Sequence, residues 1–342
     1  LAVGAALAVG GLLLLAMGVD PVAYYSRMFT MGMVGNKIAY KTFENYLKVF
    51  VPLALTSVAL SLAFKMRFWN IGAEGQIIMG AIFASYFALF HSGWPHPVLI
   101  FVMFIAGALG GGLWGLLPAF FKVKFGANET LFTLMLNYIA LHCITFLRDG
   151  PWADPDSSGF PKIARFSDNA TLDRVFGVHI GWIVALVLVV LVWVYLKYTK
   201  QGYEISVVGE SQDTARYAGI HVKKVVLRTM FLSGAVAGIA GMVQATGANK
   251  TLAAGVAGGV GFTAIIVAWL AQLNPWGILL VSSLFGILEK GSSVVESTYQ
   301  LSKDSSDILQ GILLFFVLGA EFFIRYRFVR RQRSKQAKGG DA

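Results

Sequence analysis

Long apolar runs recur along the whole chain, and most are close to the about 20 residues that an α-helix needs to cross a bilayer. Short polar or basic stretches separate them. The pattern predicts an all-α integral membrane protein with about ten transmembrane helices. The predicted spans lie at about 1–18, 50–65, 70–90, 98–121, 130–147, 180–197, 229–247, 258–272, 276–294 and 307–324. They form one transmembrane domain, residues 1–324, followed by a basic tail, residues 325–342.

Composition agrees with a membrane protein and narrows the possible partners. Of the 342 residues, 56% are hydrophobic and 13% are charged, and the mean hydropathy is +0.67. The net charge of +10 comes from short loops and the tail, where basic residues set membrane orientation, so we expect no nucleic-acid partner. The single cysteine, Cys143, excludes an internal disulfide. The first run lacks the charged leader of a secretory signal, so a spanning helix and a trimmed N-terminus are expected.

The basic residues predict which ends of the spans face the cytoplasm. By parity they fall on one side: Lys65, Arg67, Lys122, Lys124, six residues between 197 and 228, and the tail. The positive-inside rule makes that side cytoplasmic and puts both termini there. The acidic loop at 149–173 falls on the other side. Two groups of four spans, 50–147 and 229–324, then have opposite orientations, which is the parity of an inverted repeat and favours a transporter.

Polar residues interrupt the apolar spans, where a charge costs about 2.5 to 3.5 kcal/mol on insertion scales. Glu74 stands out in the stretch "FWNIGAEGQIIMG", 68–80. Its carboxylate either bonds to another helix or to Arg67, or lines a substrate path, or lies at a lipid headgroup. If Gly72 interrupts the span, the amides of the following half-helix point into the bundle. The candidates for the path or for helix register are Asn70, Glu74, Gln76, Asn128, Glu129, Asn137 and Gln244.

Three glycine-rich runs predict close approach of helices. They are "GALGGGLWG" at 107–115, "SGAVAGIAG" at 233–241 and "GVAGGVG" at 255–261. Small residues at such spacings allow two helix backbones to touch, although ordinary packing in any helical membrane protein also uses them.

The loop at 198–228 is long enough to contain a helix of its own. Ser211 is the expected N-cap of a short helix at 212–218, and Gly219 the expected left-handed stop. So short a helix is marginal alone in water, so it needs a partner. The partner is either the bundle itself or a separate soluble subunit.

Four motifs, in order, carry a resemblance to a known family. They are "FWNIGAEGQIIMGA" at 68–81, "GANETLFTLMLNYIA" at 126–140, "GESQDTARYAGI" followed by "SGAVAGIAG", and "GFTAIIVAWLAQLNPWG" at 261–277. Together they resemble the permease subunits of bacterial ABC importers of the branched-chain amino acid, ribose and nucleoside superfamily, most closely the nucleoside and simple-sugar branch. The match runs from about residue 45 to 324.

The resemblance implies a multi-pass permease of the bacterial inner membrane that imports a polar small molecule, with a nucleoside expected and a simple sugar as the alternative. The implied partners are a cytoplasmic ABC ATPase, a second permease, homologous or identical, and an extracytoplasmic substrate-binding lipoprotein. The implied ATPase-coupling residues are Gly209, Glu210, Ser211, Thr214, Ala215, Arg216, Tyr217, Ala218 and Gly219. The family commonly has Arg-Ala-Val-Gly before this helix, whereas residues 206–209 read Ser-Val-Val-Gly.

Motifs for chemistry within the chain are not found in the sequence. No G-x-x-x-x-G-K-[ST] or H-E-x-x-H motif occurs, so we expect ATP and Mg²⁺ on the partner ATPase, with no metal and no catalytic residue here. Two other classes stay open. An intramembrane transferase would use Glu74 or Glu129 as a base, and a secondary transporter would move protons through Glu74.

Overall fold

The computed structural model describes residues 2–33, 39–157 and 159–301, together with 308–309, 311–312, 315–316 and 319. The chain divides into two compact units, residues 1–26 with 296–342, and residues 27–295. Each unit is described by itself. The expected tail at 325–342 and much of the expected span at 307–324 lie outside the described residues.

The smaller unit begins with helix α1, Ala2–Ala16, which ends at a turn where Gly18 has a φ of 75°. Helix α2, Pro21–Met33, starts after Asp20, whose side chain accepts a 2.9 Å hydrogen bond from the backbone amide of Val22. The expected span at 1–18 therefore consists of a helix that stops at Ala16, followed by a bend. Together α1 and α2 are long and apolar enough to count as one broken span.

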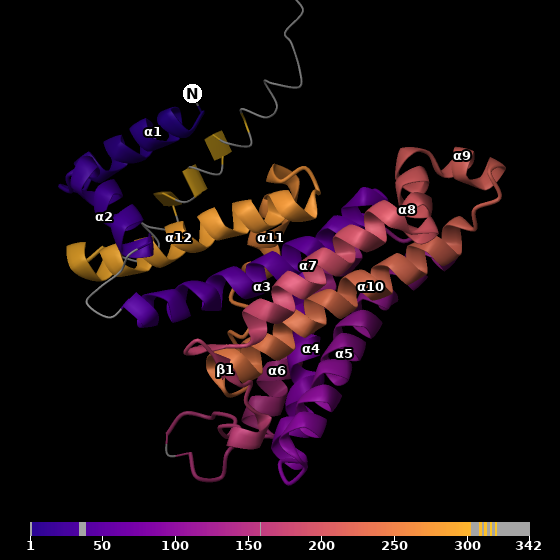
Figure 1. Ribbon diagram of the computed structural model, residues 1–342, viewed down its shortest axis with the longest axis horizontal. Coiled ribbons are helices and arrows are strands. Elements are labelled where there is room, and N and C mark those ends of the chain that lie inside the picture. The colour runs from indigo at the N-terminus through magenta and orange to yellow at the C-terminus, as the bar shows by residue number, and fades with distance from the viewer. Residues whose placement is uncertain are drawn as a thin grey trace, which may run out of the picture. The chain divides into compact units, whose positions relative to one another are not determined.

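Residues 27–295 form a helical bundle (Figure 1). Its elements after α2 are α3 Ala39–Lys65, α4 Ala73–Phe90, α5 His96–Phe125, α6 Glu129–Asp149, the 3₁₀ turn η1 Asp168–Ala170, β1 Arg174–Val175, β2 Val178–His179, α7 Gly181–Tyr198, α8 Lys200–Glu210, α9 Gln212–Tyr217, α10 Val222–Val243, the π-helical turn η2 Gln244–Asn249, α11 Val260–Leu270 and α12 Pro275–Tyr299.

Seven helices of the described residues are long and apolar enough to span a membrane, or eight with the bent pair. The difference from the ten expected spans has two sources. The apolar run at 258–272 forms only the 11-residue helix α11, and the run at 307–324 is described only at scattered positions. At 1.5 Å per residue, α11 is about 16 Å long, which is half of a hydrocarbon core.

Glycines hold the centre of the bundle together, as the glycine-rich runs predicted. Gly107 and Gly111 of α5 lie against Gly238 of α10, because a Cβ atom on Gly238 would overlap the carbonyl oxygen of Gly107. Gly80 of α4 meets the backbone of Gly238 in the same way. Helices α4, α5 and α10 thus approach backbone to backbone, which is the packing that small residues permit in membranes.

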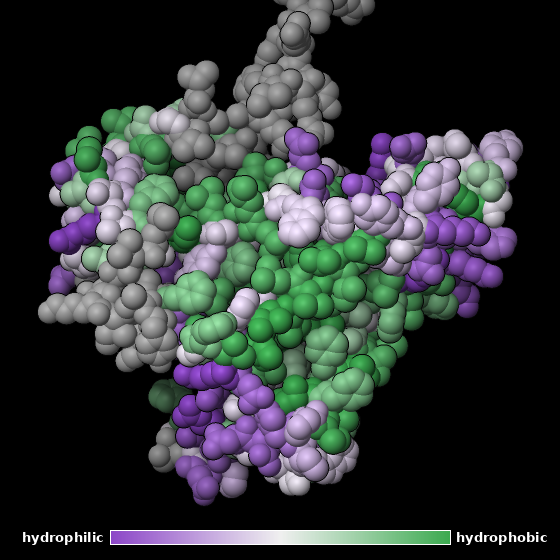
Figure 2. All heavy atoms as spheres, in the orientation of Figure 1, coloured by the Kyte–Doolittle hydropathy of each residue, from purple (hydrophilic) through white to green (hydrophobic). Residues whose placement is uncertain are grey.

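The bundle has two polar ends and an apolar band between them. One end, here called the basic end, carries Lys65, Arg67, Lys122, Lys124 and residues 197–228. The other, here called the hairpin end, carries residues 150–157 and 159–180, including the antiparallel pair β1 and β2, in which Arg174 pairs with His179. Figure 2 shows the apolar face over α7 and α10 between these two polar regions. Such a band is what lipid contact requires.

Candidate functional site

Helix α4 begins inside the bundle, after a short non-helical segment at 66–72. Asn70 is fully buried, and its side-chain oxygen accepts a 2.9 Å hydrogen bond from the amide of Gly72. The helix starts at the next residue, Ala73. The expected interruption of a span at Gly72 is therefore wrong, since no helical turn precedes Gly72 and the glycine is instead the N-cap position of α4.

Helix α6 holds this segment through two polar side chains. Asn137 accepts a 2.8 Å hydrogen bond from the amide of Gly75 and donates a 2.8 Å bond to the carbonyl of Ile71. Thr133 accepts a 3.2 Å bond from the amide of Ile71. Asn137 lies eight residues beyond Glu129, the first residue of α6, which is about 12 Å along the helix. The start of α4 is therefore well inside the bundle.

Glu74 joins the start of α4 to the start of α11. One carboxylate oxygen accepts a 2.8 Å hydrogen bond from the amide of Gly259, and the other accepts a 2.7 Å bond from the amide of Gly261. These amides belong to the first turn of α11, where the helix itself supplies no acceptor. A carboxylate there also complements the helix dipole. The expected alternative, an ion pair with Arg67, is not formed in the described residues.

A second non-helical segment, residues 250–259, leads from the hairpin end to the start of α11. At the hairpin end, Phe166 donates its amide to the carbonyl of Lys250 at 3.0 Å. At the other end Gly258 and Gly259 have positive φ angles of 59° and 84°, a conformation that L-residues adopt only under strain. This backbone geometry is why the apolar run at 258–272 does not form a full span.

The structure places the predicted polar residues in three groups. Asn70, Glu74, Gln76 and Asn137 meet where α4 begins. There the side-chain amide nitrogen of Asn70 donates a 3.3 Å hydrogen bond to the side-chain oxygen of Gln76. Two others lie at the basic end: Asn128 caps α6 by accepting from the Leu131 amide, and Glu129 forms a 2.8 Å ion pair with Lys122. Gln244, the first residue of η2, has no hydrogen bond to the first group in the described residues.

Sequence reasoning missed the partners of these residues. These partners are Thr133, which bonds to the amide of Ile71 just before α4, and Gly259 and Gly261, which bond to Glu74 at the start of α4. Thr133 lies one helical turn before Asn137, so its place on the same face of α6 was a usable signal. The amides of Gly259 and Gly261 carry no side-chain signal at all.

The expected coupling loop contains two helices rather than one. Ser211 caps α9 by accepting a 3.2 Å bond from the Thr214 amide, and Gly219 has a φ of 77°, so the predicted N-cap and left-handed stop are confirmed. Ala215 is fully buried, whereas the Tyr217 side chain is 94% exposed. Helix α8 was not expected. The remaining predicted residues of the loop are Gly209 and Glu210 at the end of α8, and Thr214, Arg216 and Ala218 in or beside α9.

Gly209 connects this loop to the bundle. A Cβ atom at Gly209 would overlap the carbonyl oxygen of Lys65, the last residue of α3, so the two backbones are in direct contact. The non-helical segment at 66–72 starts at the next residue. The end of α8 therefore contacts the backbone directly before the segment that precedes α4.

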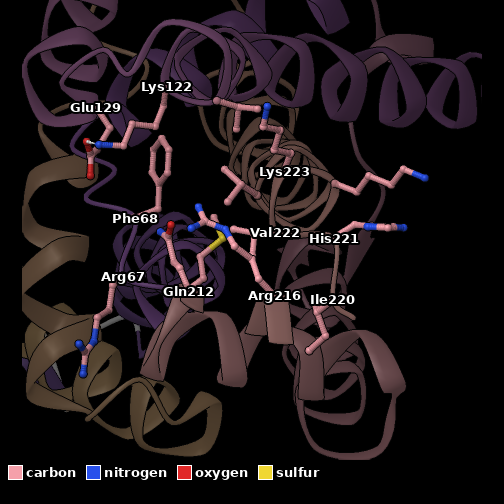
Figure 3. Close-up of a pocket in the computed structure, with 14 residues that line it drawn as sticks. Arg67, Phe68, Lys122, Glu129, Gln212, Arg216, Ile220, His221, Val222 and Lys223 are labelled. Atoms are coloured by element: carbon pink, nitrogen blue, oxygen red, sulfur yellow. Dashed lines mark ion pairs between the residues drawn. The ribbon is translucent and has the colours of Figure 1, made fainter. Parts of the chain in front are cut away.

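A cavity of about 520 Å³ lies between α9, the start of α10, the end of α5 and residues 66–68. Figure 3 shows Arg216 extending into it beside Gln212, with Phe68 above them and the Lys122–Glu129 pair at its edge. Arg216 also donates a 2.9 Å bond to Asp213.

In the described residues no three His, Cys, Asp or Glu side chains gather as a metal site would require. The two carboxylates proposed as bases are already engaged, Glu74 with two amides and Glu129 with Lys122. The arrangement is suited to holding helices and irregular backbone in position within the bundle.

Comparison with known proteins agrees with this architecture. Residues 42–318 match the family described as "Branched-chain amino acid transport system / permease component". The Glucose ABC transporter permease protein TsgB13 of Haloferax volcanii is 34% identical, over 100% of this chain and 93% of its own length. The Guanosine ABC transporter permease protein NupP of Bacillus subtilis is 31% identical over 94% and 92%. The Nucleoside ABC transporter permease protein NupB of Lactococcus lactis is 27% identical over 97% and 92%. The chain belongs to this family of transport-system permease components.

Proposed function

We propose that the chain forms part of the membrane path of an ATP-driven importer in a bacterial inner membrane, and that its substrate is a nucleoside. In this proposal the basic end faces the cytoplasm, as its lysines and arginines favour. The hairpin end then faces the substrate-binding lipoprotein. Both chain termini are proposed to lie in the cytoplasm.

The path is proposed to run beside the two non-helical segments, 66–72 and 250–259. Irregular backbone is tolerated at membrane depth only where protein buries it or where it lines a water-filled space. Gly255 and Gly258 of the second segment are exposed in this single chain. Their exposure favours an aqueous path covered by a second permease, homologous or identical, on the open side. Half-helix starts beside such a path are common in transporters.

The observation that carries the ATP-driven mechanism is the contact of Gly209 with the Lys65 carbonyl. It gives a separate ATPase a direct route to the path. An ATPase that bound α9 through the exposed Tyr217 would move α8, and α8 would move residues 66–72 and the start of α4. ATP and Mg²⁺ are proposed to stay on that ATPase.

The hydrogen bonds of Glu74 favour transport over the two other classes. A general base or a proton carrier needs a carboxylate oxygen within hydrogen-bond reach of its proton donor. Both oxygens of Glu74 accept amide hydrogen bonds, at 2.8 and 2.7 Å. Glu129 is held by Lys122 at the basic end. A weakly polar path with specificity in the binding lipoprotein fits these residues better.

For the substrate, the relatives support two chemical classes. Two of those named above carry guanosine or nucleoside in their names, and one carries glucose. A nucleoside contains a ribose ring, so both classes present sugar hydroxyl groups to the path. The nucleoside proposal therefore keeps the simple sugar as its alternative.

Substitution of Tyr217 by alanine tests the coupling proposal. Because the side chain is 94% exposed, Tyr217→Ala should leave the permease folded but reduce co-purification of the ATPase at least tenfold. The matched control is Phe160→Ala, which removes a 90% exposed aromatic side chain at the hairpin end. Equal ATPase recovery with both variants would contradict the proposed docking.

The substrate is tested with the assembled transporter in proteoliposomes. Uptake of labelled guanosine, ribose and glucose is measured with ATP inside the vesicles and the partner binding lipoprotein outside. Guanosine uptake that needs ATP supports the proposal. Uptake of glucose alone would replace the nucleoside by the sugar alternative, and uptake driven by a proton gradient without ATP would overturn the ATP-driven mechanism.

A further inference from the structure

His179 is a buried histidine at the hairpin end that the transport proposal does not use. Its side chain is 3% exposed. The imidazole lies between Gly181, at the start of α7, and Gly247 of η2: a Cβ atom on either glycine would come within 2.7 or 2.8 Å of ring nitrogen Nδ1. The two glycines thus form a slot that fits the flat ring and ties β2 to the π-helical end of α10.

Neither ring nitrogen of His179 has a hydrogen-bond partner within the described part of the chain. A neutral imidazole always has one donor and one acceptor nitrogen, and each unpaired buried polar atom destabilises the folded state. The ring is therefore held by packing alone. An added proton would give a buried cation with two unpaired donors.

The charged groups around His179 do not favour that cation as a set. From α3, Lys48 and Glu44 face it, and from β1, Arg174 faces it. Glu44 is shared, since it lies 3.4 Å from Lys48 and 3.5 Å from Arg174. The contacts from α7 and η2 are glycines, which carry no charge. Burial, followed by Lys48, lowers the pKa of His179 to about 4, with Arg174 adding to the decrease and Glu44 opposing it.

The slot lies beside the backbone that leads to the proposed path. The amide of Leu172, just before β1, is 3.4 Å from the carbonyl of Thr246 in η2, and the carbonyl of Lys250 accepts from Phe166. Segment 250–259 continues from there. We propose that His179 is a proton-sensitive latch: its neutral ring holds β1 and β2 on η2, and its protonation releases them and frees the outer end of segment 250–259.

The sign of the pH effect follows from the direction of the pKa shift. The seated ring has a pKa of about 4, and a released, hydrated ring has the ordinary value of 6.5. Between these values the released state binds the proton more readily, so the seated state is fully favoured above pH about 6.5 and loses its advantage as the pH falls toward 4. Release should become roughly tenfold more frequent for each pH unit below about 6.5.

Hydrogen exchange on the full-length chain in lipid nanodiscs tests the latch without any transport measurement. The wild type is compared at pH 7.0 and 5.5 with His179→Phe, whose ring fills the slot but does not titrate. Comparing variants at the same pH cancels the pH dependence of chemical exchange. Peptides covering 172–181 and 244–250 should exchange about tenfold faster in the wild type than in His179→Phe at pH 5.5. At pH 7.0 the two proteins should exchange at the same rate.

The matched control is His142→Phe, at an exposed position on α6, which should behave as the wild type. Because His179→Phe risks poor packing, a second measurement follows the histidine ring resonances of ¹³C-histidine-labelled protein. The resonance that is missing from His179→Phe identifies the His179 ring of the wild type. At pH 6 that ring should be neutral while it is seated. Two results would overturn the latch. One is a His179 ring that titrates near pH 6.5 while hydrogen exchange of the two peptides does not change with pH. The other is exchange in the wild type and in His179→Phe that responds equally to acid.

An effect of the latch on uptake rests additionally on the proposed function. If exchange shows release in acid but uptake does not change between pH 7.0 and 5.5, the latch stands and its placement on the substrate path is wrong. If exchange shows no release, the latch itself fails, whatever the uptake assay gives.

Discussion

Each of the two non-helical segments of the bundle leads into a helix, but different contacts hold the two segments in place. Segment 66–72 leads to α4 and is held by several side chains, from Asn70 within the segment and from Thr133 and Asn137 on α6. Segment 250–259 leads to α11 and is glycine-rich. At its inner end, in the described residues, one side chain holds it, the carboxylate of Glu74.

This difference suggests different roles for the two segments. Backbone that several side chains hold along its length has few alternative positions, whereas glycine backbone held only near its two ends reorganises when one of those contacts is lost. We therefore expect segment 66–72 to act as scaffold and to transmit motion from α8, and segment 250–259 to rearrange during transport. Substitutions at the two sites should separate stability from transport.

The largest effect is expected for Glu74→Ala. It leaves the amides of Gly259 and Gly261 without acceptors, and two charge-assisted hydrogen bonds are worth about 4 kcal/mol together. Uptake should fall more than tenfold. Unfolding in mixed detergent micelles gives the stability change, and Glu74→Gln, which keeps one acceptor oxygen, should lie between. Wild-type uptake by Glu74→Ala would show that α11 does not need this carboxylate.

Asn137→Ala is expected to cost about 3 kcal/mol of stability, since a buried amide and a carbonyl lose their partners. If segment 66–72 is scaffold, the folded fraction should still transport its substrate, so uptake per folded molecule should change less than threefold. Thr145→Ala is the control on the same helix, because its hydroxyl bonds only to the Leu141 carbonyl one turn before it. A loss of uptake without a loss of stability would reverse the assigned roles.

How far the sequence determined these features depends on how local they are. The cap at Ser211 and the stop at Gly219 were predictable because both need only a few neighbouring residues. The glycine contacts of α5 with α10 were predictable in kind from the two glycine-rich runs. The partners of Glu74 were not, since they are backbone amides 185 and 187 residues away.

The length of α11 was also beyond reach from composition. An apolar run at 258–272 favours helix throughout, and only the adjacent Gly258 and Gly259, a dipeptide typical of turns, pointed to the positive φ angles found there. The expected interruption of a span at Gly72 was wrong for a related reason. A glycine inside an apolar run is compatible with a kink, a helix start or a close contact, and only the position of α6 decides among them.

Gly261→Ala, in the first turn of α11, should lower the free energy of unfolding by about 2 kcal/mol. It tests the contact between the two segments from α11. An added methyl group would overlap the backbone nitrogen of Glu74 and would lie 2.8 Å from its carboxylate, which is overpacking at a close backbone contact. Uptake should decrease with stability. Gly255→Ala is the control in the same region, because a Cβ atom there meets nothing within 4 Å.

Gly259→Ala is expected to have the smallest effect, a decrease of about 1 kcal/mol in the free energy of unfolding. It changes the backbone conformation without adding a steric contact. No atom lies within 4 Å of a Cβ at Gly259, so space is not the cost, but its φ of 84° is strained for alanine. The strain acts on the same turn that Glu74 caps. If segment 250–259 rearranges during transport, Gly259→Ala should slow uptake more than its small stability loss explains, while Gly93→Ala, at an equally open glycine outside the segment and without a positive φ, should leave uptake unchanged. Equal uptake by both variants would mean that the left-handed turn at Gly259 is only a fixed connection to α11.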